Sequence, residues 1–315
     1  MIQLDHVTKR YRGGRGILDL SFEVHEGEVF GYLGPNGAGK STTIRTLMGF
    51  LRPDSGLAKI HNRDCWEDAA KIHEHIGYLP GEIGFLEGMT GIGFLDVIAG
   101  MRKLSRLEYR DELIRRLDFD ARTPIRKMSK GVKQKVGIVA AFMHKPSVLI
   151  LDEPTSGLDP LMQQLFLDLV LEAKSRGATV LMSSHVFAEV ERVCDRVGII
   201  RDGRLVAVED VRRLRETQRK VFTVHLREGL QAETLVAAGC RVTNAQVTKS
   251  GTNEVDVEVQ GDYNAFVRAL AQCDVANIEV RELNLEEVFM HYYASDTAHA
   301  NDDATGVSGK GGIGE

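Results

Sequence analysis

The chain of 315 residues is long enough for two domains, each with its own hydrophobic core. Its formal net charge of −5, from 40 Lys and Arg against 45 Asp and Glu, argues against a general attraction to nucleic acid. No stretch approaches the ~18–20 apolar residues of a membrane-spanning helix, and the N-terminus lacks the basic and apolar regions of a secretory signal.

The N-terminal region alternates polar and apolar residues in short stretches. Gly13-Gly14 and Glu26-Gly27 interrupt residues 1–32 in the way that turns between strands do. This pattern predicts an antiparallel β-sheet. From Leu33 the pattern becomes strand, helix and strand, which is typical of a parallel sheet with helices on its faces. The predicted fold class is therefore α/β.

A glycine-rich stretch lies between a predicted buried strand at 28–33 and a predicted helix at 40–50. Residues 34–41, Gly-Pro-Asn-Gly-Ala-Gly-Lys-Ser, match the phosphate-binding pattern G-x-x-x-x-G-K-[ST] at every fixed position. The glycines permit backbone angles that a Cβ would forbid, so the loop can turn its N–H groups inward around a phosphate. The flanking strand and helix favour this interpretation over a chance glycine-rich turn.

The residues of this phosphate loop have separate predicted roles. Lys40 is expected to reach the β- and γ-phosphates, the Ser41 hydroxyl to coordinate Mg²⁺, and Thr42 to contact the α-phosphate. The predicted nucleotide-binding residues of the loop are Gly34, Pro35, Asn36, Gly37, Ala38, Gly39, Lys40, Ser41 and Thr42.

An apolar strand at 148–152 ends in two carboxylates. Asp152 is expected to hold Mg²⁺, directly or through water, and Glu153 to polarise the water that attacks the γ-phosphate. Taken alone, such a strand end is often a solvated acidic turn. The phosphate loop elsewhere in the chain favours the nucleotide site. Together the two stretches predict that the chain uses ATP with Mg²⁺.

The motifs together resemble those of the ATPase subunits of ATP-binding cassette (ABC) proteins. Residues 152–159, Asp-Glu-Pro-Thr-Ser-Gly-Leu-Asp, match the segment that in this family leads from the magnesium strand into a loop crossing a dimer interface, at Asp159. Residues 128–135 occupy the place of the family signature. His185 matches the histidine that contacts the γ-phosphate, and Tyr11 the aromatic that stacks on adenine. The resemblance covers about the first 215 residues.

The signature region explains why the family works in pairs. Ser129 begins a predicted helix that runs to about His144, so its free N–H donors and partial positive charge lie at the Ser129 end. Ser129 is also expected to cap that helix. The resemblance implies that Ser129, Lys130 and Gly131 face the γ-phosphate held by the other copy, so that two nucleotides are sandwiched between two cassettes.

Two positions depart from the family pattern. Lys130 replaces the first glycine of the signature, and it either approaches the opposing triphosphate or points into solvent. Gly81 stands where the family usually has a glutamine near Mg²⁺ and the attacking water. One hypothesis is that Glu82 takes over part of that role as a metal ligand. The alternative is that Glu82 is a solvated loop acid and the water is held less well.

The remaining elements define the predicted domains. Residues 85–144 are expected to form a helical lobe, and 1–219 as a whole the ATPase domain. Residues 220–294 predict a small α+β domain, and 295–315 a disordered tail. Packing or dimer stabilisation is favoured for the small domain over a ligand sensor. Its predicted elements are strands at 221–226, 241–247, 254–259 and 278–282, helices at 231–238 and 262–273, and a last helical piece at 285–293 that resembles a segment of drug-exporter ATPases.

A second set of predicted elements completes the ATPase domain. They are a helix at 161–175, a buried strand at 179–183, a hairpin at 197–207 that turns at Asp202-Gly203, and a charged helix at 210–219.

Because transport needs a path through lipid, the resemblance implies a separate transmembrane permease subunit. It also implies a cytoplasmic ATPase on the inner face of the membrane, acting with an identical or paralogous copy, and export as the direction. The four cysteines lack paired spacing, which fits reduced thiols in the cytosol. One alternative is a soluble ABC-type ATPase acting on ribosomes or nucleic acid. Another is a cassette that binds ATP but hydrolyses it poorly.

Overall fold

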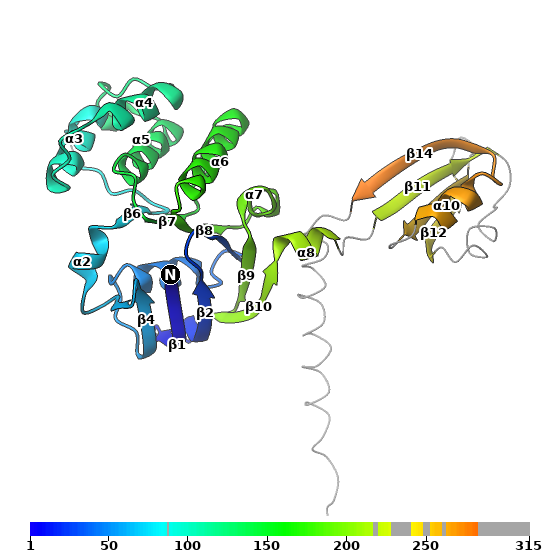
Figure 1. Cartoon of the computed structure of the whole chain (residues 1–315), viewed down its shortest axis with the longest axis horizontal. Coiled ribbons are helices and arrows are strands. Elements are labelled where there is room, and N and C mark those ends of the chain that lie inside the picture. The colour runs from blue at the N-terminus through cyan, green and yellow to red at the C-terminus, as the bar shows by residue number, and fades with distance from the viewer. Residues whose placement is uncertain (87, 217–219, 228–240, 248–252, 260–262, 283–315) are drawn as a thin grey trace, which may run out of the picture. The chain divides into compact units, whose positions relative to one another are not determined.

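The computed structural model describes residues 1–86, 88–216, 220–227, 241–247, 253–259 and 263–282 (Figure 1). The chain divides into two compact units, Met1–Val211 and Arg212–Glu315. The helix predicted at 231–238, the helical piece at 285–293 and the tail at 295–315 lie outside the described residues. Within the described residues, no helix combines the length and the apolar character needed to cross a membrane.

The first unit begins with an antiparallel sheet. Its strands are β1 (Ile2–Arg10), β2 (Gly16–Val24), β4 (Ser55–Ile60) and β5 (Arg63–Asp64), in the order β2-β1-β4-β5. The prediction of an antiparallel N-terminal sheet is confirmed for β1 and β2. It was wrong about where that sheet ends, because β3 (Val29–Leu33) pairs in parallel with strands of the other sheet. All five residues of β3 are buried, as expected of a strand covered on both faces.

The second sheet has six strands in the order β10-β9-β3-β8-β7-β6. The pairs from β9 to β6 are parallel, and only β10 is antiparallel, through a hairpin turn in which Asp202 and Gly203 have φ of 48° and 77°. In an open parallel sheet, the carboxyl ends of the strands lie at one edge. The phosphate loop after β3, Asp152 in β7 and His185 after β8 therefore meet at that edge. Besides β3, its strands are β6 (Ile76–Leu79), β7 (Val148–Asp152), β8 (Thr179–Ser184), β9 (Arg196–Arg201) and β10 (Arg204–Asp210).

Helices α3, α4 and α5 lie together as the helical lobe of the first unit (Figure 1). The Arg116 guanidinium of α4 donates to both carboxylate oxygens of Glu172 in α6, at 2.8 and 2.5 Å, and so ties the lobe to the core. The helices of this unit are α1 (Lys40–Leu47), α2 (Ala69–His73), α3 (Gly91–Met101), α4 (Glu108–Arg116), α5 (Lys130–Phe142), α6 (Pro160–Ser175) and α7 (Phe187–Val193). Helix α8 (Val211–Glu216) begins at the last residue of the first unit and continues into the second.

The second unit contains an antiparallel four-stranded sheet in the order β12-β13-β11-β14. Helix α10 (Tyr263–Leu270) packs on it, and the core includes Val224, Val257 and Phe266. The strands are β11 (Lys220–Leu226), β12 (Arg241–Val247), β13 (Asn253–Val259) and β14 (Val275–Glu282).

His144, just after α5, makes the stability of the first unit depend on pH. Its Nε2 lies 3.2 Å from the Ile76 carbonyl oxygen, and its Nδ1 is buried without a hydrogen-bond partner in the described part of the chain. Burial, helped by the charge of Arg102, lowers the pKa of His144 from 6.5 to about 4. The folded chain therefore favours the neutral ring, while the unfolded chain takes up a proton as the pH falls below about 6.5.

We expect the free energy of unfolding to fall by about 2 kcal/mol between about pH 7.5 and 5 because of this one ring. Replacing His144 by glutamine keeps an N–H donor for the Ile76 carbonyl but removes the titration. Urea unfolding at both pH values should then show a smaller loss for His144→Gln than for the parent. Equal losses in the two proteins would contradict the assignment.

Candidate active site

The phosphate loop joins β3 to α1, and its glycines act for two different reasons. Gly37 and Gly39 have φ of 84° and 113°, in the left-handed region that favours glycine. Gly34 does not, so the expectation that it supplies a special backbone angle was wrong. A Cβ on Gly34 would instead lie 2.4 Å from the Ile200 carbonyl oxygen of β9. Close approach of two backbones therefore explains this glycine.

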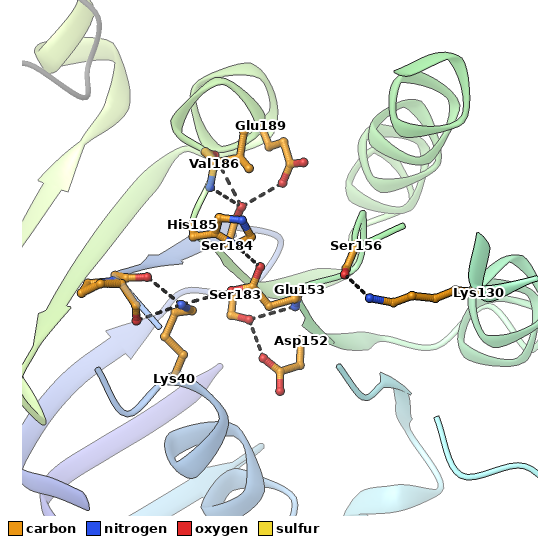
Figure 2. Close-up of polar contacts among 12 residues, drawn as sticks. Lys40, Lys130, Asp152, Glu153, Ser156, Ser183, Ser184, His185, Val186 and Glu189 are labelled. Atoms are coloured by element: carbon orange, nitrogen blue, oxygen red, sulfur yellow. Dashed lines mark hydrogen bonds and ion pairs between the residues drawn. The ribbon is translucent and has the colours of Figure 1, made fainter. Parts of the chain in front are cut away.

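Lys40 is almost fully buried at the start of α1, with 6% of its surface exposed. Its ammonium donates to the Gly34 carbonyl at 2.6 Å and to the Pro35 carbonyl at 3.3 Å. It also lies 3.1 Å from Oε1 of Glu153, an ion pair without hydrogen-bond geometry. The loop thus fixes a positive charge directly beside the carboxylate at the end of β7 (Figure 2).

One serine of the neighbouring strand bonds to the Asp152 carboxylate at the end of β7 and to the Glu153 backbone just after it. The Ser183 hydroxyl of β8 donates to Oδ1 of Asp152 at 2.6 Å and accepts from the Glu153 backbone N–H at 3.0 Å. Glu153 has a φ of 47°, which is uncommon outside glycine and typical of strained functional positions. The sequence predicted position 183 only as the end of a buried strand, because the contact of Ser183 with β7 comes from the pairing of the two strands.

His185 contacts Glu153 from the other side. Its Nδ1 lies 2.6 Å from Oε2 of Glu153 (Figure 2). The loop that carries His185 is fixed by its neighbours, because the Ser184 hydroxyl donates to Glu189 at 2.8 Å and accepts from the Val186 N–H at 2.9 Å. Glu189, in α7, is only 5% exposed. No pattern in the sequence around Glu189 indicated that it would accept a hydrogen bond from Ser184.

Two adjoining pockets share Asn36, Ser41 and Glu153. The first, of about 280 Å³, is lined by Tyr11, Arg15, Glu153 and most of the phosphate loop, together with Thr42. Arg15 was not predicted as a site residue. Its carbonyl accepts from the Tyr11 N–H at 2.8 Å across the turn between β1 and β2, which brings the two side chains to the same pocket.

The second pocket, of about 450 Å³, brings the predicted metal ligands together. Ser41, Glu82 and Asp152 all line it, as do Lys130 and His185. Asp152 is 5% exposed and forms no ion pair with any residue that the structure describes. Hydroxyl and carboxylate oxygens are the ligands that Mg²⁺ prefers, and a buried carboxylate without a cation is a suitable place for one. The residues present therefore fit a magnesium ion.

The other predicted residues lie elsewhere. The Ser129 hydroxyl accepts from the Val132 N–H at 3.3 Å and caps α5, and Asp159 accepts from the Met162 N–H at 3.0 Å and caps α6. Neither Ser129, Gly131 nor Asp159 is among the described residues that line the two pockets. Lys130, which lies between Ser129 and Gly131, does line the second pocket.

Known proteins resemble this chain in sequence along most of its length. Residues 17–156 match the ABC transporter family. An uncharacterized ABC transporter ATP-binding protein of Bacillus subtilis is 32% identical over 92% of this chain and 95% of its own length. The bacitracin transport ATP-binding protein BcrA of Bacillus licheniformis is 32% identical over 94% of this chain and 98% of its own.

A solved structure of an ATP-binding subunit of an ABC transporter superimposes with a TM-score of 0.64 and 32% identity. The match covers 68% of this chain and 92% of that one. Its coverage reaches no further than about two thirds of the present chain, whereas the two relatives match along most of it. The chain belongs to the ABC transporter family, as an ATP-binding subunit.

Proposed function

We propose that this subunit hydrolyses ATP to drive an exporter, and that it acts at the cytoplasmic face of a membrane with a separate permease. The observation that carries the proposal is the position of Glu153, which contacts Lys40 at 3.1 Å and His185 at 2.6 Å beside the buried Asp152. The likeness to a bacitracin transport protein along nearly the whole chain supports a transport role.

In this proposal each residue has a part in hydrolysis. Glu153 would take a proton from the attacking water, and the contacts of its backbone with Ser183 and of its side chain with His185 support this role. Lys40 would neutralise charge on the terminal phosphates, and Tyr11, which lines the same pocket, would stack on the base. Ser41 and Asp152 would hold Mg²⁺, which supplies positive charge toward the phosphates when bound.

A second copy completes the site in this proposal. Ser129 and Gly131 would face the triphosphate held by the other protomer, and Asp159 would lie at the interface between the two. The separation of Ser129 from the pockets of its own chain supports this arrangement. We assign residues 1–219 to the ATPase domain and 220–294 to a small domain that packs or stabilises the dimer.

Purification of the chain with and without a co-expressed cognate permease tests the proposal. We expect phosphate release from ATP that requires Mg²⁺, and recovery in membrane fractions only when the permease is present. Nucleotide-dependent binding to ribosomes or to DNA would instead support the soluble alternative. Binding of ATP without phosphate release would support the poorly hydrolysing alternative.

Glu82 provides a more specific prediction. It lines the same pocket as Ser41 and Asp152, while a Cβ on the preceding Gly81 would lie 3.4 Å from Oδ2 of Asp152. If Glu82 helps to hold Mg²⁺ or the attacking water, Glu82→Ala and Glu82→Gln should each lower steady-state ATPase by about tenfold. Unchanged rates in both variants would assign Glu82 to the solvated surface.

Glu189 should act on turnover through His185. Glu189→Ala removes the acceptor of the Ser184 hydroxyl and frees the loop that carries His185. We expect kcat to fall by about tenfold with little change in the KM for ATP. Glu189→Gln keeps an acceptor oxygen and serves as the matched control, with turnover near that of the parent. A rise in KM for Glu189→Ala at constant kcat would contradict this role.

A further inference from the structure

We propose that Lys130 is a positioning residue that ties the signature helix α5 to Glu153 within the same chain. The inference rests on the proposed ATPase function and adds to it a route by which the two are coupled. The sequence left two places for this lysine, the opposing triphosphate or solvent. The structure shows a third position, in which the Lys130 side chain contacts the segment that follows Glu153.

The ammonium group of Lys130 donates to the Ser156 hydroxyl at 3.1 Å (Figure 2). Its methylene groups pass over Gly157, because a Cβ on Gly157 would lie 3.3 Å from both Cγ and Cδ of Lys130. Gly157 itself has a φ of 82°. The lysine therefore packs against the backbone of the turn as well as bonding to its side chain.

Two other residues of α5 hold the same turn. The Gln134 side-chain amide, which is 4% exposed, donates to the Pro154 carbonyl at 2.7 Å. A Cβ on Gly131 would lie 2.7 Å from the Gly157 carbonyl oxygen, so the helix and the turn are in close backbone approach. With Lys130, the first two turns of α5 thus contact this segment at three successive points, Pro154, Ser156 and Gly157.

Backbone hydrogen bonds of the turn connect these contacts to Glu153. The Ser156 N–H donates to the Glu153 carbonyl at 3.1 Å, and the Leu158 N–H donates to the Thr155 carbonyl at 3.0 Å. These overlapping turns begin at Glu153, whose backbone is already in the left-handed region. A shift of Ser156 is therefore also a shift of Glu153 relative to Ser183 and His185. In this way helix α5, which Ser129 caps at its N-terminus, determines the position of Glu153.

A double-mutant cycle on the purified full chain tests the proposal. Lys130→Met keeps the methylene packing and removes the donor, Ser156→Ala removes the acceptor, and the third variant carries both changes. We expect each single change to lower kcat by about tenfold with an unchanged KM, and the double variant to be no worse than either single one. Lys130→Arg, which retains a donor, should keep most of the parent kcat.

Lys127→Met is the matched control, since Lys127 is an exposed lysine three residues before Lys130 and lines neither pocket. It should leave kcat close to that of the parent. If Lys130→Met raises KM while Ser156→Ala does not, the lysine acts on the nucleotide directly and the proposal is overturned. Additive losses, or a Lys130→Met rate equal to that of the parent, overturn it as well.

The test separates this inference from the proposed function. A parent chain that releases no phosphate would refute the ATPase proposal. In that case the double-mutant cycle is measured by thermal unfolding. Non-additive shifts in Tm support the Lys130–Ser156 contact, and additive shifts overturn it. An active parent with an additive cycle refutes the tie alone.

Discussion

Glu153→Gln is expected to lower ATP turnover by about a thousandfold while leaving ATP binding intact. Glutamine has the shape of glutamate and keeps one acceptor oxygen, so the backbone bond to Ser183 and the packing at the end of β7 are retained. What it loses is the negative charge beside Lys40 and His185, which in the proposed mechanism accepts the proton of the attacking water. The loss should therefore appear in kcat.

Phosphate release measures the first effect, and equilibrium binding of labelled ATP the second. Because ATP is bound but not cleaved, Glu153→Gln should also form a stable dimer with ATP on size exclusion. Glu67→Gln, at an exposed position outside both pockets, is the control and should turn over ATP at the parent rate. A persistent monomer would argue against the sandwich, and turnover near the parent rate would argue against Glu153 as the base.

Local patterns in the sequence were sufficient for the phosphate loop and for the strand that ends at Asp152. Both motifs are contiguous, and each side chain is placed by the few residues around it. The position of β3 could not be read in the same way. Its five apolar residues follow two alternating strands, but its partners β8 and β9 begin 150 or more residues later in the chain. Only the folded structure shows that β3 joins the parallel sheet and not the antiparallel one that precedes it.

The supporting residues of the site could not be predicted either, because they too come from distant parts of the chain. Ser183 reaches Asp152 from a strand 31 positions away, and Lys130 reaches Ser156 across 26 positions. Neither spacing belongs to a recognisable motif, because each contact depends on how β8 and α5 pack against β7. Arg15 is the exception, since its distance of four residues from Tyr11, across a turn, gave a local signal that was not used.

Mixing two inactive variants is expected to restore activity if each site is completed by the other copy. Lys40→Met removes the buried cation of the phosphate loop and should prevent productive ATP binding at that site. Ser129→Asp preserves the helix cap, because aspartate is a good N-cap residue, but places a negative charge against the opposing triphosphate. Each variant alone should lose about a hundredfold or more of its ATPase activity.

In a mixed dimer, one site combines the intact loop of the Ser129→Asp chain with the intact signature of the Lys40→Met chain. Random pairing of equal amounts makes about half of the dimers mixed, and each mixed dimer has one active site of two. The mixture should therefore recover about one quarter of the parent activity when the two sites hydrolyse ATP independently. Ser129→Asn, which also caps the helix but carries no charge, is the control and should stay much more active than Ser129→Asp. A mixture no more active than the average of its two components would show that each chain hydrolyses ATP with its own signature helix, and the two-copy site would have to be abandoned.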